Sequence, residues 1–171
     1  AAASTIQEQA EDLYAISEKA RWIESYLRNS SRERTSIRIT EMVRDAIQDL
    51  ESDYPSARFD LDLVPNEPAL ADPMVDVAMN HLIQNGLEHN DGSPWVRIES
   101  MVTEHDVVIR VIDNGPGIPP DEIDVLERGE ETEMNHTSGM GLWVAKWIIE
   151  ASGGELTFGH REPTGTIAIV R

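Results

Sequence analysis

The stretch Asp113-Asn114-Gly115-Pro116-Gly117-Ile118 decides the fold that we expect for this chain. It follows residues 106–112, whose β-branched side chains are typical of a buried strand. An acid at a strand end, followed by two spaced glycines, places a fixed carboxylate beside backbone that a flat ligand can approach closely. Such a carboxylate accepts a hydrogen bond from an exocyclic amine, the feature that marks adenine. An ordinary turn is the alternative, because Asn-Gly and Pro-Gly are common turn dipeptides.

A second glycine-rich stretch, Thr137-Ser138-Gly139-Met140-Gly141-Leu142, opens a helix predicted over residues 141–151. Backbone that runs into a helix N-terminus presents unpaired N–H groups and the positive end of the helix dipole, and both favour phosphate. The stretch is not the phosphate loop of P-loop enzymes, since no Gly-Lys-Ser/Thr follows. N-capping of the helix by Ser138 is the alternative reading.

A polar group of residues lies on the helix predicted over residues 73–88. Spacings of three and four place them on one face, whereas Leu82, Ile83 and Leu87 point to the core. The members of this face are His81, Asn85, Glu88 and His89. An amide oxygen beside an acid or imidazole can hold Mg²⁺, which prefers oxygen ligands and several waters. A solvated helix face is the alternative.

Apolar periodicity predicts the remaining elements. Residues 6–27 carry a heptad-like seam, suited to pairing with another helix or to packing on its own domain, and residues 37–50 form an amphipathic helix. Loops are expected before residue 73 and between residues 113 and 141. Strands are expected at 59–63, 96–99, 106–112, 155–158 and 166–170. This mixture, without regular crossovers, predicts an α+β sandwich with helices on one face of a mixed sheet.

The order of these segments resembles the Bergerat ATP-binding fold, and within that superfamily it is most similar to sensor histidine kinases. Residues 82–89 resemble the family's asparagine-containing box, and residues 113–118 resemble its first glycine box. Residues 138–142 resemble the second glycine box, and Gly165-Thr166 resembles the closing Gly-Thr strand. The resemblance covers residues 37–171 and implies a two-layer sandwich that binds ATP and Mg²⁺.

The resemblance also implies roles for single residues. Asn85 would bind Mg²⁺ and, with His81, serve catalysis, while Asp113 would read the adenine amine. Residues 119–137 would form a lid over the nucleotide. The nucleotide contacts implied in this way are Asn85, Glu88, His89, Asp113, Gly115, Gly117, Ile118, Ser138, Gly139, Met140, Gly141, Leu142 and Thr166.

The implied function is transfer of the ATP γ-phosphoryl group to a histidine, and then to the receiver domain of a response regulator. Residues 1–30 would be a partial dimerisation and phosphotransfer helix, residues 36–171 the ATP-binding domain, and the intact kinase a homodimer. A non-catalytic, ATP-gated interaction module and a serine kinase of the anti-sigma type are the alternatives.

Several positions depart from the family pattern. None of the five histidines lies in a phosphoacceptor pattern, so the acceptor is expected outside this sequence. His81 stands where relatives often have asparagine and where ATP-hydrolysing branches carry a catalytic glutamate, so fast hydrolysis is not expected. Glu88 stands where many kinases have a cation. Arg128 is the only cation of the lid, and it is either a phosphate contact or a surface residue. Trp143 and Trp147 are expected to pack rather than to stack on adenine.

The formal net charge is −18, and it excludes most nucleic-acid partners, because phosphate binding needs a basic patch and Lys+Arg is only 14. This charge, with Lys19 and Lys146 as the only lysines, predicts a salt-rich cytoplasm of the haloarchaeal type, with an ordinary acidic mesophilic protein as the alternative. No stretch is long and apolar enough to span a bilayer. We therefore expect a cytoplasmic segment without membrane contact of its own, whether or not the parent protein is membrane-associated.

Overall fold

The computed structural model describes residues 17, 33–65, 68–88, 90, 92–128 and 140–171. The chain divides into two compact units, Ala1–Glu33 and Arg34–Arg171. The helix predicted over residues 6–27, and with it the dimerisation segment 1–30, lies outside the described residues except for the helical Ser17.

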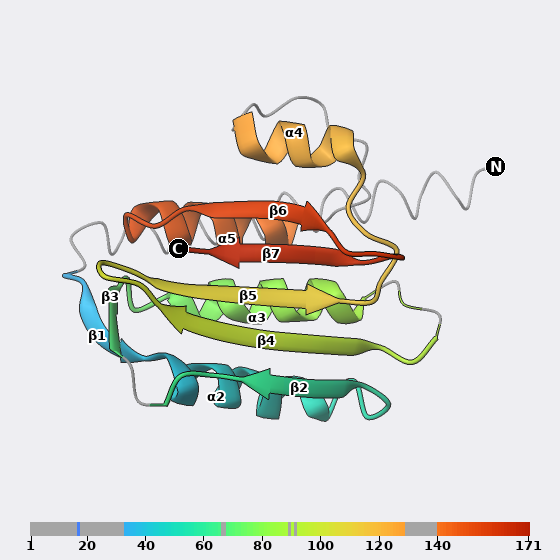
Figure 1. Ribbon diagram of the computed structural model, residues 1–171, viewed down its shortest axis with the longest axis horizontal. Helices are drawn as coiled ribbons and strands as arrows, with labels where there is room; N and C mark the ends of the chain where they lie inside the picture. The colour runs from blue at the N-terminus through green and yellow to red at the C-terminus, as the bar shows by residue number, and fades with distance from the viewer. Residues whose placement is uncertain (1–16, 18–32, 66–67, 89, 91, 129–139) are drawn as a thin grey trace. The chain divides into compact units, whose positions relative to one another are not determined.

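A five-stranded mixed sheet forms one layer of the second unit (Figure 1). Its strands in spatial order are β2 (Arg58–Asp62), β4 (Trp95–Val102), β5 (Val107–Asp113), β7 (Thr166–Val170) and β6 (Leu156–His160). β2 pairs parallel to β4, and all other neighbours pair antiparallel. The centre of the sheet is therefore β5, and its last residue is Asp113.

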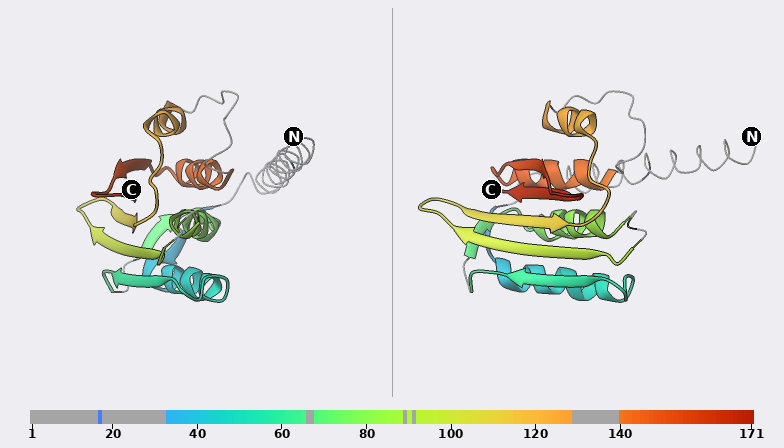
Figure 2. Two further views of the ribbon diagram at one scale, coloured as in Figure 1. Left: turned by 90° about the vertical axis from the view of Figure 1, so that its right-hand side faces the viewer. Right: turned by 45° about the vertical axis from the view of Figure 1, so that its right-hand side comes forward.

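Three helices form the other layer, on one face of the sheet (Figure 2): α2 (Ile39–Glu51), α3 (Val75–Leu87) and α5 (Met140–Ala151). In α2 the buried residues recur every three or four positions, so one stripe faces the core. α5 is buried on nearly all sides from Leu142 to Ile149. The α+β sandwich predicted from the sequence is confirmed, as is the packing role of Trp143, which is only 2% exposed.

Two short strands correct the sequence prediction. β1 (Thr35–Arg38) pairs antiparallel with β3 (Pro68–Ala71). The helix expected from residue 37 therefore begins at Ile39, and part of the loop expected before residue 73 is a strand. Strands of four residues contain too few alternations to be recognised locally, and they form here because each pairs with a segment thirty or more residues away.

The prediction of a long loop between residues 113 and 141 is also wrong in part, because α4 (Pro120–Arg128) lies within that segment. The signals of a helix were present. Pro120 occupies the first helical position, Asp121 and Glu122 stand near the positive end of the dipole, and Arg128 stands near its negative end. The apolar Leu126 is 2% exposed and anchors the helix.

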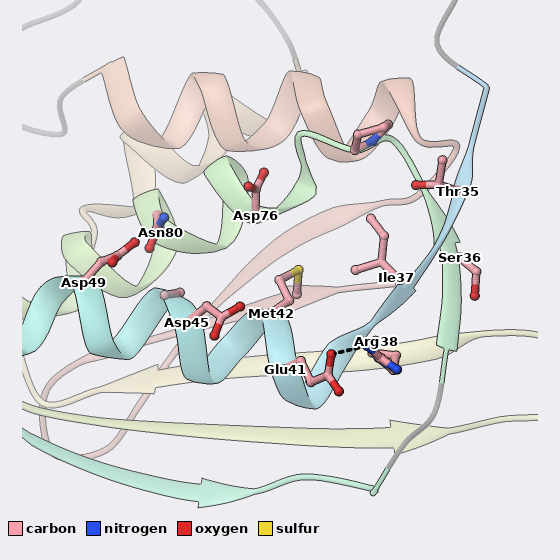
Figure 3. A pocket seen from close by; sticks show the side chains of 12 residues that line it. Thr35, Ser36, Ile37, Arg38, Glu41, Met42, Asp45, Asp49, Asp76 and Asn80 are labelled. Carbon is pink, nitrogen blue, oxygen red and sulfur yellow. Dashed lines mark ion pairs between the residues drawn. The ribbon is translucent and has the colours of Figure 1, made fainter.

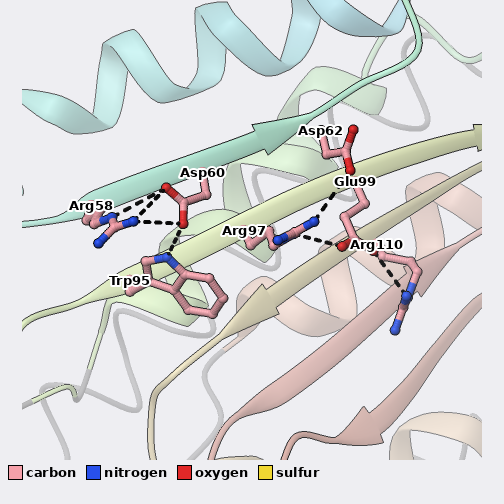
Figure 4. A network of polar contacts seen from close by, with 7 residues as sticks. All are labelled: Arg58, Asp60, Asp62, Trp95, Arg97, Glu99 and Arg110. Atoms are coloured by element: carbon pink, nitrogen blue, oxygen red, sulfur yellow. Dashed lines mark hydrogen bonds and ion pairs between the residues drawn. The ribbon is translucent and has the colours of Figure 1, made fainter.

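The outer face of the sheet carries a charged network across β2, β4 and β5 (Figure 4). Arg97 pairs with Glu99 at 2.7 Å and with Asp62 at 3.4 Å, and Arg110 pairs with Glu99 at 3.1 Å. The Trp95 indole N–H donates to Asp60 at 2.8 Å, and this hydrogen bond is the main reason that the pKa of Asp60 is lowered. Exposed pairs of this kind contribute little stability each. This face is therefore solvated, and the helix-facing side carries the core.

Candidate nucleotide site

The carboxyl group of Asp113 is the centre of the candidate site. Asp113 is 5% exposed, and its Oδ1 accepts hydrogen bonds from the backbone N–H of Gly115 at 2.8 Å and of Thr166 at 3.1 Å. The Thr166 side chain also hydrogen-bonds this carboxyl group. An ionised carboxylate can accept about four hydrogen bonds. The group is thus held in place by its own neighbours and still has acceptor capacity for a ligand.

Burial raises the pKa of Asp113, and this effect outweighs the opposing ones. The N–H groups of Gly115 and Thr166, the Thr166 side chain and the charge of Arg161 all favour the ionised form and lower the pKa. The ionised group is therefore costly in the protein alone. A buried, perturbed carboxylate at a strand end is typical of a functional site.

Gly86 allows α3 to lie directly against the end of β5. A Cβ at Gly86 would lie 2.8 Å from the Cβ of Asp113 and 3.2 Å from Cγ2 of Val96. Contacts of 2.8 Å between carbons do not occur without movement, so no larger residue fits in this arrangement. Gly86 is a residue of the site that sequence reasoning missed, although a glycine inside a helix is a signal of close packing.

The turn after Asp113 packs against the turn between β6 and β7. Gly117 has a φ of +85°, and a Cβ there would lie 3.4 Å from the carbonyl oxygen of Gly165 and 3.8 Å from Nδ1 of His160. Gly165 lies against the carbonyl oxygen of Asp113 itself. The predicted first glycine box and the predicted Gly-Thr strand are therefore brought together at one end of the sheet.

Asn114 is a residue of the site that sequence reasoning treated only as part of a turn. Its Oδ1 accepts hydrogen bonds from the Trp95 backbone N–H and the Asn90 side chain, both at 2.8 Å, and its Nδ2 donates to the Ser93 carbonyl at 3.1 Å. One side chain thus holds the segment between α3 and β4 to the end of β5. Its only local signal was its place directly after the strand.

The polar face of α3 has three described members. The Asn85 side chain is part-buried, and among the described residues it has no hydrogen-bonding partner. Glu88 is held by Gln84, whose Nε2 donates to Oε1 at 2.7 Å. The pKa of Tyr54 is raised chiefly by burial and further by the charge of Glu88. Glu88 thus has a hydrogen-bonding partner on its own helix, whereas Asn85 can offer its amide oxygen to a ligand. His89 lies outside the described residues.

The second glycine stretch is described only in part. Ser138, Gly139 and the side chain of Met140 lie outside the described residues. Gly141 faces His81, whose Nδ1 would lie 3.1 Å from a Cβ at that position. The Leu142 side chain is 1% exposed and belongs to the core, so only its backbone can contact a ligand.

The remaining predicted contacts differ in burial. Ile118 is half-buried, and Thr166 is 5% exposed. Arg128 ends α4, is two-thirds exposed, and pairs with Asp124 at 3.6 Å. This pairing is consistent with the surface reading of Arg128. The predicted lid continues through residues 129–137, which lie outside the described residues.

The residues of this site fit the Mg²⁺ ion that the family implies. Within the described ranges no cluster of three acidic or histidine side chains could hold a metal ion. Mg²⁺ usually keeps several waters and takes one or two protein ligands together with substrate phosphates. An open amide oxygen from Asn85 meets this requirement without any acidic cage.

A separate hollow lies between α2 and α3 (Figure 3). Acidic residues from both helices surround it, among them Asp45, Asp49 and Asp76. Asn80 of α3 lines this hollow. None of the residues that the sequence singled out lines it, so it is distinct from the site at the end of β5.

Known proteins define the class of this chain. Residues 73–171 match the family of histidine kinase-, DNA gyrase B- and HSP90-like ATPases, and the chain belongs to this family. Curated relatives include the signal transduction histidine-protein kinase AfsQ2 of Streptomyces coelicolor, 37% identical over 66% of this chain and 22% of that protein. The sensor histidine kinase RegB of Cereibacter sphaeroides is 31% identical over 60% of this chain and 26% of that protein. The chain thus spans about a quarter or less of these relatives.

Solved structures support the same fold. The catalytic domain of the histidine kinase ThkA superimposes with a TM-score of 0.71 at 22% identity, covering 81% of this chain and 95% of that one. The Acinetobacter baumannii histidine kinase AdeS superimposes with a TM-score of 0.70 at 20% identity, covering 98% of this chain and 81% of that one. No helix among the described residues is long and apolar enough to cross a membrane.

Proposed function

We propose that residues 36–171 bind Mg-ATP and transfer its γ-phosphoryl group to a histidine outside this sequence, as the catalytic domain of a cytoplasmic two-component sensor kinase. The observation that carries the proposal is the buried Asp113 carboxylate, fixed by Gly115 and Thr166 with acceptor capacity to spare. The exocyclic amine of adenine is a donor that this group can read.

The chemistry needs little from the protein beyond placement and charge. A bond forms between an imidazole nitrogen and the γ-phosphorus while the bond to the β,γ-bridging oxygen breaks, and ADP leaves. Bound Mg²⁺ supplies neutralisation of the phosphate charge. Asn85 would hold the metal through its amide oxygen, and the N–H groups at the N-terminus of α5 would donate hydrogen bonds to the phosphates. The phosphoryl group then passes to the receiver domain of a response regulator.

Residues 1–30 are proposed to contribute to a dimerisation bundle, which makes the intact kinase a homodimer. The apolar seam over residues 6–27 supports this assignment, because a partner helix in a bundle would cover it. The acceptor histidine would lie on another helix of that bundle.

The decisive experiment supplies the acceptor. The chain is incubated with γ-labelled ATP, Mg²⁺ and a histidine-bearing bundle helix of the parent kinase added in trans, in molar salt. We expect acid-labile, base-stable phosphohistidine on the added helix, and at least a tenfold slower reaction for Asn85→Ala, or about 1.4 kcal/mol in the barrier. Asn80→Ala is the matched control, since Asn80 lies on the same helix but lines the separate hollow.

The other outcomes are equally informative. Saturable Mg-ATP binding without any transfer would favour an ATP-gated interaction module. Label on serine would favour a kinase of the anti-sigma type. A folded chain that does not bind Mg-ATP at all would contradict the proposal.

We also propose that the chain is adapted to a salt-rich cytoplasm. With a net charge of −18, raising KCl from about 0.1 M to about 1 M shortens the Debye length from roughly 10 Å to roughly 3 Å and screens the self-repulsion of the folded state. We expect the unfolding temperature to rise steadily over this range in scanning calorimetry. An unfolding temperature that is flat or falls with KCl would identify an ordinary acidic protein instead.

A further inference from the structure

We propose that His81 is a positioning residue for the phosphate-facing end of α5, and that position 141 is a glycine because the His81 imidazole occupies the space of its side chain. This inference rests on the proposed function for its consequence, but the contact itself belongs to the protein without nucleotide.

The contact is specific to one side chain. A Cβ at Gly141 would lie 3.1 Å from Nδ1, 3.5 Å from Cγ and 3.6 Å from Cβ of His81, and these are its three nearest atoms. The distance of 3.1 Å is shorter than ordinary van der Waals contact, so an alanine at position 141 requires the imidazole to move. The two residues come from α3 and α5, which pack against each other.

The place of this contact gives it a function. Gly141 lies in the first turn of α5, where the backbone N–H groups have no partner within the helix. The residues that follow directly are enclosed, since Leu142 to Ala145 are all at most 4% exposed. Through the contact between His81 and Gly141, α3 therefore sets the position of the first turn of α5. Phosphoryl transfer is sensitive to displacements of about 1 Å.

The usual explanation of a glycine at such a place is that the ligand must approach the backbone closely. The two explanations predict different results. If the glycine serves the ligand, an added methyl group harms binding whatever residue stands at position 81. If it serves His81, shortening residue 81 removes the harm.

The test is a double-mutant cycle in calorimetric Mg-ATP titrations. We expect Gly141→Ala to weaken binding about tenfold, or about 1.4 kcal/mol, in the presence of His81. In the His81→Ala background the same substitution should change binding less than about twofold. His81→Asn retains a short polar side chain, so its Mg-ATP affinity should be closer to that of the original protein than the affinity of His81→Ala is. Equal losses from Gly141→Ala in both backgrounds would overturn the proposal.

The same cycle in chemical unfolding separates this inference from the proposed function. The contact exists without nucleotide, so the free energies of unfolding of the four proteins should also be non-additive. Gly159→Ala replaces Gly141→Ala in the control cycle, because the nearest atoms to its Cβ lie at an ordinary 3.9 Å. Its effect on the free energy of unfolding should add to that of His81→Ala. If the original protein binds no Mg-ATP but unfolding shows coupling, the proposed function fails and the contact stands. Additive unfolding energies would overturn the contact itself.

Discussion

Asp113→Asn is expected to weaken Mg-ATP binding at least tenfold, or about 1.4 kcal/mol. Asparagine keeps the oxygen that accepts from the N–H groups of Gly115 and Thr166. Its second oxygen becomes an NH₂ group, which meets the adenine amine as donor to donor. A buried donor left without an acceptor costs about 1–3 kcal/mol. Calorimetric titration in molar salt measures the loss, and unchanged affinity would contradict the assignment of Asp113 to adenine.

The same substitution is expected to stabilise the protein without nucleotide at neutral pH. Because the pKa of Asp113 is raised in the folded state, its contribution to stability is fully present below the unfolded value of about 3.9 and is lost as the pH rises through the folded pKa. A neutral amide does not suffer this loss. Asp113→Asn should therefore unfold at a higher temperature than the original protein near pH 7, and its advantage should vanish below about pH 3.9.

Asp106→Asn is the matched control for this stability difference. It removes one negative charge in an exposed turn, so it reports the effect of net charge alone. A gain for Asp113→Asn no larger than that for Asp106→Asn would mean that burial of the carboxylate is not the cause.

Gly165→Ala is expected to cause the largest loss of stability, roughly 3 kcal/mol or more. Gly165 has a φ of +128°, a conformation that residues with a side chain rarely adopt, and an added Cβ would meet the carbonyl oxygen of Asp113. Both the strain and the overlap must be relieved by moving the end of β7 away from β5. Urea unfolding measures the change in the free energy of unfolding.

Gly159→Ala, in the same hairpin, tests whether the loss is particular to Gly165. Its Cβ would make only ordinary contacts at 3.9 Å, so its effect should stay within about 1 kcal/mol. Comparable losses in the two variants would contradict the close approach of the two turns.

Local sequence determined the elements that are long and periodic. The apolar spacing of 37–50, 73–88 and 141–151 predicted the three helices of one layer, and short runs of alternating or β-branched apolar residues predicted the five strands of the sheet. Asp113 was also placed correctly at a strand end, because a β-branched run followed by glycines is readable from neighbouring residues alone. α4 could have been found in the same way, from Pro120 and the acids that follow it.

The fine structure of the candidate site depended on contacts that no local pattern contains. Glu88 is predicted to contact the nucleotide together with Asn85, and in the structure its charge also raises the pKa of Tyr54, a residue from a distant part of the chain. The side chain of Asn114 joins a segment about twenty residues earlier in the chain to the end of β5. These partners become neighbours only when the sheet and the helix layer assemble.

The glycines show the same division most clearly. The resemblance to the family's glycine boxes and closing Gly-Thr strand identified Gly117, Gly141 and Gly165 as important, because these boxes are local patterns. Only the tertiary structure decided why each is a glycine: Gly141 faces His81, and Gly165 faces the backbone of Asp113. Secondary structure follows from interactions within a few residues, whereas the space allowed to a side chain is set by whatever packs against it from elsewhere in the chain.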